Sequence, residues 1–378
     1  MLKRLVAKTW AEVFKRLKTR SDLCIVTTNT EWGGSEAVWL SVYQDLKKSN
    51  KNVIIFAPPP LIQKIYERKL IPLEETKLFP YYPDRKILNT IKTFLRLSIH
   101  KPKLAYISQQ YSMDAYFWME NFKLLPTPYI NFIPLCLVSV WPSDEVLLRM
   151  LTLFNKSKLL MFDSTTNMAF FDILFGFKFE NKLAVSHALP SIQYKQKTVS
   201  DEEVTLGIMA RFECHHKAFD LLLESLSGLK NSKWKLLIAG HGPHQELISR
   251  IVALYGLQSR VQIETNMNLK EFYSKTDVLL FPSRFEGTPL LLISALTANK
   301  VCVVNNCGGM GEIITNGQDG FVSKNISAEG FRSALTECLQ NRTKWAEIQN
   351  NCPKALQRYS QLPEIVSKVK EVVQNDNR

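Results

Sequence analysis

One stretch, from Asp277 to Phe321, limits what this chain can fold into more than any other. It opens with a short apolar run, Val278–Phe281, which predicts a buried strand that Pro282 ends. An apolar helix is expected over Leu290–Ala298, and Val301–Val304 predicts a second strand. A strand, a helix and a strand in this order indicate a parallel α/β sheet.

The loop between that first strand and its helix has the features of an anion site. Glu286 and Gly287 lie at the carboxyl end of the strand, Thr288 is expected to be the N-cap, and Pro289 the first helical residue. The unpaired N–H groups of a helix start attract anions, and ligands of open α/β sheets bind at this edge. We therefore predict phosphate binding near Glu286.

Three segments in this order and spacing identify a family. FPSRFEGTPLLLISAL is followed by GGMGEII at Gly308–Ile314 and by NGQDGFV at Asn316–Val322. The set resembles the retaining glycosyltransferases of family 4, the glycosyl transferases group 1. The resemblance implies an α/β protein with the GT-B fold, two Rossmann-like doubly wound domains facing across a cleft. A chain of 378 residues, 46% of them hydrophobic, is long enough to fill two such cores.

The expected domain layout follows from that resemblance and from the apolar runs. It comprises a basic amphipathic helix over 1–20, an acceptor domain over 21–190, a linker over 191–203, a donor-binding domain over 204–354, and a C-terminal helix over 355–378 that crosses back to the first domain. Other buried strands are predicted at Asp22–Thr27, Asn52–Phe56, Leu104–Ile107, Tyr129–Ile133, Leu159–Asp163, Leu183–Val185, Val204–Met209 and Trp234–Ala239.

Two loops are predicted to meet the donor's diphosphate. Arg211 follows the Val204–Met209 strand, Lys217 comes six residues later, and such cations can grip a diphosphate from two sides. The resemblance assigns both to the departing nucleoside diphosphate, although Ala218 stands where the family usually has glycine. Gly240 opens GHGP, which resembles the family's GxGP turn. The alternative is that Arg211 and Lys217 merely face solvent.

The first strand is followed by WGGSE, with Trp32, Gly33 and Gly34. Paired glycines there let backbone amides approach a ligand, although a tight turn is the alternative. The resemblance places this loop beside donor and acceptor. Gln109, Trp141 and Asp144 also follow predicted strands and are candidates for the acceptor site. For Trp141 the alternative is core packing or a loop anchor, and for Asp144 it is a charge at a helix start.

The resemblance also gives the remaining site residues their roles. Glu286, Arg211 and Lys217 are the predicted catalytic residues. The predicted donor-binding residues are Gly33, Gly34, Gly287, Thr288, Leu290, Ser294 and Gly240, and the predicted acceptor-binding residues are Trp32, Gln109, Trp141 and Asp144. Ser294 is a departure, because the family has a second glutamate there that holds the ribose hydroxyls, and a serine binds them more weakly.

No metal or cofactor is expected, and the nucleotide-diphospho-sugar is the co-substrate. Cys214, His215 and His216 are adjacent and cannot easily converge on one ion, and the chain has no D-x-D sequence. The seven cysteines form no CxxC pair, which suggests reduced thiols in a cytosolic protein. No apolar run is long enough for a spanning helix, and the start lacks the apolar core of a signal peptide.

The net charge of +13 is concentrated in part at the start of the chain, where the first twenty residues hold seven Lys or Arg. A basic amphipathic helix there can lie on an anionic membrane, or else pack on its own domain. Nucleic-acid binding is not expected, since no recognisable module accompanies the charge.

The leading hypothesis is therefore a retaining glycosyltransferase that transfers a sugar from a nucleotide-diphospho-sugar to a hydroxyl of a glycan or lipid-linked acceptor in the synthesis of cell-surface polysaccharide. Its expected location is the cytoplasm or, peripherally, the inner face of the membrane. The rival is a non-catalytic binding or scaffold subunit of the same fold, which Ser294 favours. A third reading, a sugar-nucleotide epimerase, needs an acid and base pair that no motif assigns.

Overall fold

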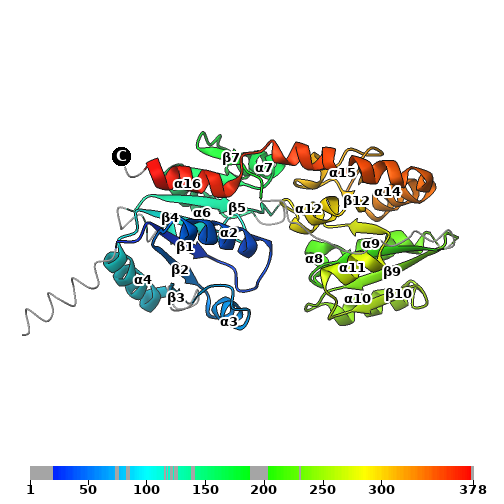
Figure 1. The fold of residues 1–378 in the computed structure, drawn as a ribbon, viewed down its shortest axis with the longest axis horizontal. Helices are drawn as coiled ribbons and strands as arrows, with labels where there is room; N and C mark the ends of the chain where they lie inside the picture. The colour runs from blue at the N-terminus through cyan, green and yellow to red at the C-terminus, as the bar shows by residue number, and fades with distance from the viewer. Residues whose placement is uncertain are drawn as a thin grey trace, which may run out of the picture. The chain divides into compact units, whose positions relative to one another are not determined.

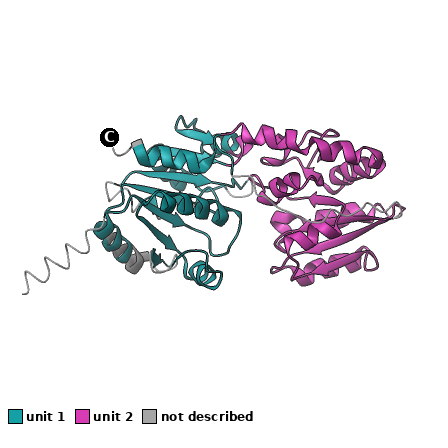
Figure 2. Ribbon diagram, viewed as in Figure 1, with its two compact units in different colours: residues 1–162, 168–187, 363–378 teal, residues 163–167, 188–362 magenta. Residues whose placement is uncertain are grey.

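The computed structural model describes residues 20–72, 76–81, 86–114, 116, 118–119, 122, 127–137, 141–187, 203–229 and 231–375. They form two compact units (Figure 2). Unit 1 takes the described residues of 1–162, 168–187 and 363–378, and unit 2 those of 163–167 and 188–362. The basic helix predicted over 1–20 and the linker predicted over 191–203 lie outside the described residues, except for Arg20 and Glu203.

Unit 1 is built on a parallel sheet whose strand order is β3-β2-β1-β4-β5-β6-β7 (Figure 1). Parallel pairing requires a crossover between neighbouring strands, and helices supply most of them. The strands are β1 (Leu23–Thr27), β2 (Val53–Ala57), β3 (Lys77–Pro80), β4 (Leu104–Ser108), β5 (Tyr129–Ile133), β6 (Leu159–Phe162) and β7 (Lys182–Ala184).

Helices cover both faces of this sheet. In β1, Leu23 and Ile25 pack with α2, α3 and α16, whereas Cys24 and Val26 pack with α6 and α7 on the other face. This follows from the two-residue period of a strand. The helices are α2 (Gly34–Lys48), α3 (Pro59–Glu67), α4 (Lys86–His100), α6 (Asp144–Asn155), α7 (Thr165–Phe175) and α16 (Ile365–Asn375).

Unit 2 repeats the plan with a second parallel sheet, of order β10-β9-β8-β11-β12-β13 (Figure 1). The step from β10-β9-β8 to β11 reverses the direction in which strands are added, so the carboxyl ends of β8 and β11 flank the place where ligands of such sheets bind. The strands are β8 (Val204–Met209), β9 (Trp234–Ala239), β10 (Val261–Glu264), β11 (Val278–Phe281), β12 (Val301–Asn305) and β13 (Phe321–Ser323).

The helices of unit 2 also lie in two layers. One buried cluster joins the sheet to α9, α10 and α14, and the other joins it to α11, α12, α13 and α15. The helices are α8 (Cys214–Lys217), α9 (Phe219–Ser227), α10 (Gln245–Leu254), α11 (Leu269–Lys275), α12 (Leu290–Thr297), α13 (Met310–Ile313), α14 (Ala328–Gln340), the 3-10 helix η1 (Arg342–Lys344) and α15 (Trp345–Ser360).

The C-terminal tail differs from the single helix predicted over 355–378. Residue 355 lies inside α15 of unit 2, and the chain turns at Pro363 before α16 packs against α2 in unit 1. At the turn, the backbone N–H of Ser186 donates to Pro363 O, and that of Ile365 donates to Ser186 O. The tail was misread because Leu356 and Ile365 continue one apolar pattern across the break.

The predicted α/β class with two Rossmann-like parallel sheets is confirmed. Among the described residues, no helix is both long enough and apolar enough to cross a bilayer.

Candidate active site

The loop after β11 carries the central residue of the candidate site. All four residues of β11 are buried, and the loop 282–289 leads from its carboxyl end into α12. Pro289 is the N-cap of α12, so the predicted start at Thr288 is wrong by one residue. The Thr288 hydroxyl instead donates to the backbone oxygen of Asp163 at 2.5 Å, and its side chain is buried.

Glu286 is a buried carboxylate held by groups from two loops. Its Oε1 accepts from Lys217 Nζ at 2.5 Å and from Ser283 Oγ at 2.8 Å. His216 Nε2 lies 3.3 Å from Oε2, within ion-pair distance although without the geometry of a hydrogen bond. Two potential cations therefore face one carboxylate that is 9% exposed.

Electrostatics keep Glu286 ionised. Burial by itself raises the pKa of this carboxyl, but Lys217 and His216 act in the opposite direction and hold the pKa of Glu286 far below its ordinary value. The site thus contains a fixed negative charge and a matching ammonium. An incoming phosphate must share Lys217 with Glu286 or take it over.

Lys217 is placed by a short, well-capped helix. The carboxylate of Glu213 accepts from the backbone N–H groups of His215 and His216, which fixes the start of α8. The helix ends at Ala218, whose φ of 53° lies in the left-handed region that glycine prefers. Ala218 stands where the family usually has glycine, and it adopts the left-handed backbone that glycine would supply. This conformation costs an alanine about 1–2 kcal/mol.

Arg211 stands at the carboxyl end of β8 in the same unit. Its side chain is exposed, and within the described residues it makes no hydrogen bond or ion pair. Lys217 is therefore paired and Arg211 is available. A free guanidinium at the carboxyl end of a parallel strand is suited to bidentate contact with phosphate.

Gly240 serves the packing of the Arg211 loop. A Cβ on Gly240, whose φ is 142°, would lie 2.0 Å from the backbone oxygen of Ala210. The neighbouring backbone is tied as well, since Phe212 N donates to His241 O and His244 N donates to Phe212 O. Gly240 therefore holds two loops together, which is a role that its predicted ligand contact does not require.

Glycines also bring the loop after β12 against Glu286. Gly308 has a φ of 50°, and a Cβ there would lie 2.0 Å from the backbone oxygen of Glu286. The backbone N–H of Gly309 donates to Gly287 O at 2.7 Å. The predicted Gly287 and the two glycines after β12 thus form one close backbone contact beside the carboxylate. Leu290, the first residue of α12, is half-buried.

Ser294 does not face open space. It is buried on α12, and its Oγ lies 2.8 Å from the hydroxyl oxygen of Tyr273. The prediction that Ser294 reaches toward the nucleotide is therefore wrong for this conformation, since its hydroxyl is already bonded in the interior. No carboxylate stands on this turn of α12.

The predicted residues of unit 1 have local partners. Gly33 precedes α2, Gly34 begins it, and both are exposed. Trp32 is half-buried, with its ring centroid 6.2 Å from that of Trp39 and the Arg68 guanidinium 5.8 Å from its own. The WGGSE loop is therefore anchored on one side and open at its glycines.

Of the three other candidates in unit 1, one is buried and two are exposed. Gln109 is fully buried and its Nε2 donates to Asn131 Oδ1 at 3.0 Å, so it does not line a surface as predicted. Trp141 is 58% exposed, so it is not packed in the core, and its edge-on ring contact with Phe170 agrees with the loop-anchor alternative. Asp144 is the exposed first residue of α6, which agrees with a helix-start charge.

Sequence reasoning missed several residues around Glu286. His216 had been considered only as a metal ligand, yet its ring stacks on Phe285 with centroids 4.8 Å apart and faces the carboxylate. Ser283 and Asn167 were not singled out; Asn167 Nδ2 donates to the backbone oxygen of Glu286 at 3.1 Å. Only Ser283, three residues before Glu286, was close enough in sequence to suggest a contact.

A second buried carboxyl, Asp163, lies in the part of unit 2 contributed by residues 163–167. Burial raises its pKa well above the ordinary value, the backbone N–H of Thr288 lowers it, and the charge of Glu286 raises it further. Its Oδ1 has no hydrogen-bond partner among the described residues. The pKa of Asp163 is therefore shifted in the opposite direction to that of Glu286.

Part of the chain is similar in sequence to known glycosyltransferases. Residues 191–355 match the model of the family described as Glycosyl transferases group 1. Over 127 residues the chain is 30% identical to the amylovoran biosynthesis glycosyltransferase AmsD of Erwinia amylovora, a match that covers 33% of this chain and 36% of that protein. Over 113 residues it is 28% identical to the lipopolysaccharide core mannosyltransferase LpsB of Rhizobium meliloti, covering 28% and 32%. The chain thus spans about a third of the length of these curated relatives.

The solved structures extend the likeness to the whole fold. The crystal structure of Anabaena HepE in complex with UDP superimposes with a TM-score of 0.72 at 16% identity, covering 93% of this chain and 98% of that one. The fold is therefore that of the GT-B glycosyltransferases, with two Rossmann-like units. Within it, residues 191–355 match the model of the glycosyl transferases group 1, the family that the sequence motifs resemble.

Proposed function

We propose that the chain is a retaining glycosyltransferase that transfers a sugar from a nucleotide-diphospho-sugar to a hydroxyl of a glycan or lipid-linked acceptor in the synthesis of a surface polysaccharide. The observation that carries the proposal is the ionised Glu286 paired with Lys217, in the segment that matches the family, with an unpaired Arg211 in the same unit. AmsD and LpsB, which act in amylovoran and lipopolysaccharide synthesis, support the acceptor class.

In this proposal Arg211 and Lys217 neutralise the diphosphate as it leaves. The bond from the anomeric carbon to the diphosphate oxygen breaks while the acceptor oxygen bonds to the same face of that carbon. The acceptor's proton passes to the departing phosphate oxygen, so no protein base is required. Cations fixed in advance stabilise the charge that develops there, and one such contact is worth about 10²–10³-fold in rate.

Glu286 has two tasks in the same proposal. Its charge orients the transferred sugar through the sugar's hydroxyls, and it holds Lys217 in place before the donor arrives. The buried Ser283 hydroxyl, 2.8 Å away, keeps the carboxylate in one rotamer. The exposed Gly33, Gly34 and Trp141 of unit 1 are proposed to meet donor and acceptor, and residues 1–20 to contact an anionic membrane.

A direct experiment is to incubate the protein with UDP-, GDP- and ADP-sugars and oligosaccharide acceptors, and to follow the anomeric configuration of the product by proton NMR. UDP-glucose is tried first, because HepE has also been solved with UDP-glucose. We expect an α-linked product from an α-linked donor, undiminished by EDTA, and loss of product with Glu286→Gln. An inverted product would refute retention, and activity that disappears with EDTA would refute metal independence.

The second candidate is a non-catalytic binding subunit. It is favoured by the Ser294 hydroxyl, which is buried against Tyr273 and leaves no carboxylate on that turn of α12. Such a subunit binds no nucleoside diphosphate. Thermal unfolding with UDP, GDP and ADP separates the two candidates, since only a ligand of the folded state raises the midpoint.

A further inference from the structure

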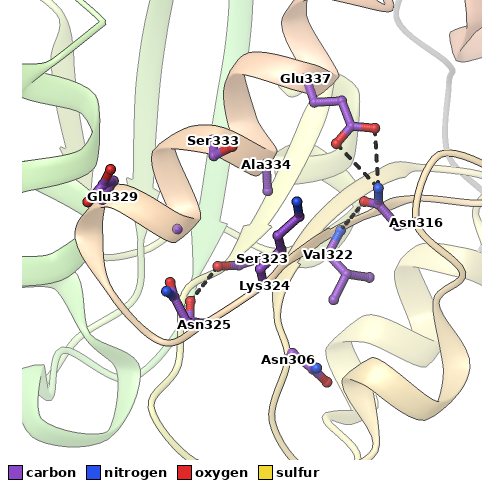
Figure 3. A pocket seen from close by; sticks show the side chains of 11 residues that line it. Asn306, Asn316, Val322, Ser323, Lys324, Asn325, Glu329, Ser333, Ala334 and Glu337 are labelled. Carbon is purple, nitrogen blue, oxygen red and sulfur yellow. Dashed lines mark hydrogen bonds between the residues drawn. The ribbon is translucent and has the colours of Figure 1, made fainter.

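A groove lies at the edge of the unit 2 sheet. It is a cavity of about 420 Å³ between the edge strand β13 and α14 (Figure 3). In the sheet, β12 lies between β13 and β11, the strand that leads to Glu286. The volume is within the range of about 300–1,000 Å³ that small-molecule sites occupy.

Internal hydrogen bonds organise two sides of the groove. Asn316 Oδ1 accepts from the backbone N–H of Val322 at 2.8 Å, and Asn316 Nδ2 donates to both Glu337 oxygens at 3.2 and 3.3 Å (Figure 3). Ser323 Oγ donates to Asn325 O at 2.5 Å. The amide of Asn316 therefore satisfies one backbone N–H of the edge strand β13 and is fixed before any ligand enters.

Other lining groups are unused. Lys324, Asn306, Glu329 and Ser333 are all exposed, and within the described residues none of their side chains makes a hydrogen bond or ion pair. They come from the ends of β12 and β13 and from α14. Figure 3 shows the Lys324 side chain lying between the α14 residues and Asn316. One ammonium, one amide, one carboxylate and one hydroxyl are thus free to face a ligand.

The charge and polarity of the lining restrict that ligand. Lys324 is opposed by Glu329 and Glu337, so the groove has a formal excess of one negative charge and disfavours nucleotides and anionic lipids. Val322 and Ala334 offer apolar side chains and the stems of the polar residues add carbon surface, so the lining combines carbon patches with hydrogen-bonding groups, as the faces and hydroxyls of a sugar do. Groups that donate and accept hydrogen bonds without net attraction for anions suit a neutral polyhydroxylated molecule.

We infer that this groove is a second glycan site, which binds a neutral oligosaccharide segment of the acceptor or product apart from the Glu286 site. The inference rests on the proposed function for the origin of the glycan, but its geometry is independent of donor binding. By holding part of a growing chain, the groove raises the local concentration of acceptor ends and favours longer acceptors over shorter ones.

The test uses the full chain with maltohexaose, cellohexaose and a neutral β-galactan hexasaccharide as probes, and hexagalacturonate as the anionic comparison. Binding is measured by isothermal titration without any donor. Ser333→Trp fills the groove and Lys324→Ala removes its ammonium, while Ser249→Trp on the exposed face of α10 is the matched control. The UDP-induced thermal shift of each variant is recorded separately.

We expect at least one neutral probe to bind at millimolar concentration, about tenfold more weakly to Ser333→Trp and Lys324→Ala, and unchanged to Ser249→Trp. The anionic probe should bind less well than the neutral ones. Absence of binding by every neutral probe, or binding that survives both groove variants, would overturn the inference. Glycan binding without any nucleotide-induced shift would retain the groove and remove the proposed transferase function instead.

Discussion

Each unit buries one glutamate near the carboxyl edge of its sheet, and the two glutamates are held in opposite ways. Glu286 of unit 2 faces Lys217 and His216, and its pKa is held far below the ordinary value. Glu36 of unit 1 is 1% exposed, and within the described residues it accepts only from neutral donors, namely Thr27 Oγ1, Asn29 Nδ2, Gly33 N and Ser35 Oγ. Burial raises the pKa of Glu36, and those hydrogen bonds reduce the rise without cancelling it.

The difference separates a scaffold carboxyl from a functional one. Glu36 ties the loop before α2 to the end of β1, a task for which hydrogen bonds suffice and charge is a cost. Glu286 has the same burial problem, yet the Lys217 ammonium and the His216 ring stand beside it. Charged side chains gathered around a buried carboxylate are typical of sites that bind charged ligands. For this reason we propose unit 2 as the donor site.

The largest expected effect is on catalysis, where variants around Glu286 should differ most from a variant of Glu36. Arg211→Ala or Lys217→Met should lower kcat/KM about 10²-fold or more, because each removes a cation from the leaving diphosphate. Glu36→Gln, which alters a buried carboxyl of unit 1, should lower it far less. The measurement is initial rate against donor concentration. Equal losses in all three variants would show that the charge around Glu286 has no special role.

Lys217→Met should also destabilise the fold, by about 1–3 kcal/mol, because it leaves the buried Glu286 carboxylate with His216 and Ser283 alone. Urea unfolding monitored by tryptophan fluorescence measures this. Arg250→Met is the matched control, since Arg250 forms only an exposed pair with Glu246 on α10, and its change should be within a few tenths of a kcal/mol. A loss no larger than that of the control would contradict the pairing.

The two glutamates should make opposite contributions to the dependence of folding stability on pH. The low pKa of Glu286 stabilises the fold above the unfolded value of 4.5, and this contribution is lost as the pH falls through the folded pKa. The raised pKa of Glu36 gives stability that is complete below 4.5 and is lost as the pH rises through its folded pKa.

Glu286→Gln should therefore cost more at neutral pH than in acid, and Glu36→Gln should cost less at neutral pH than in acid. Urea unfolding of both variants from acid to neutral pH measures the two slopes. Because His216 also faces Glu286, the series is repeated with His216→Gln. Slopes of the same sign in that background would refute the assignment of charge states.

The smallest expected effect concerns the neutral pair of unit 2. Tyr273→Phe leaves Ser294 Oγ without its partner and should cost about 0.5–1.5 kcal/mol, with no dependence on pH, since neither group ionises near neutrality. Urea unfolding at two pH values tests both points. A cost that varied with pH would show that the pair is coupled to Glu286.

Much of the fold could be predicted from the sequence. The apolar runs of β5, β8, β9 and β11 gave their bounds correctly, since buried parallel strands read as continuous apolar segments. Pro59 begins α3, as proline does at a helix start, and no helix was predicted there. The strands β3 and β10 were not predicted; their half-exposed residues give no apolar run.

The candidate site was legible only in part. Motifs supplied Glu286, Arg211 and Lys217, but not that Lys217 and Glu286, separated by 69 positions, contact each other. The contact arises because β8 and β11 are neighbours in the sheet, which brings the loops after them together. No local sequence pattern encodes that pairing of strands. Gln109 and Ser294 failed for a related reason, because position after a strand or on a helix does not reveal which side chain already has a buried partner.

The central claim is that unit 2 binds a nucleoside diphosphate through Arg211 and the Lys217–Glu286 pair. Its most direct test is the thermal unfolding midpoint of the wild type, Arg211→Ala and Arg250→Ala with millimolar UDP, GDP and ADP. We expect at least one nucleotide to raise the midpoint of the wild type and of Arg250→Ala, and Arg211→Ala to abolish the rise. No rise with any nucleotide, or an equal rise in Arg211→Ala, would contradict it.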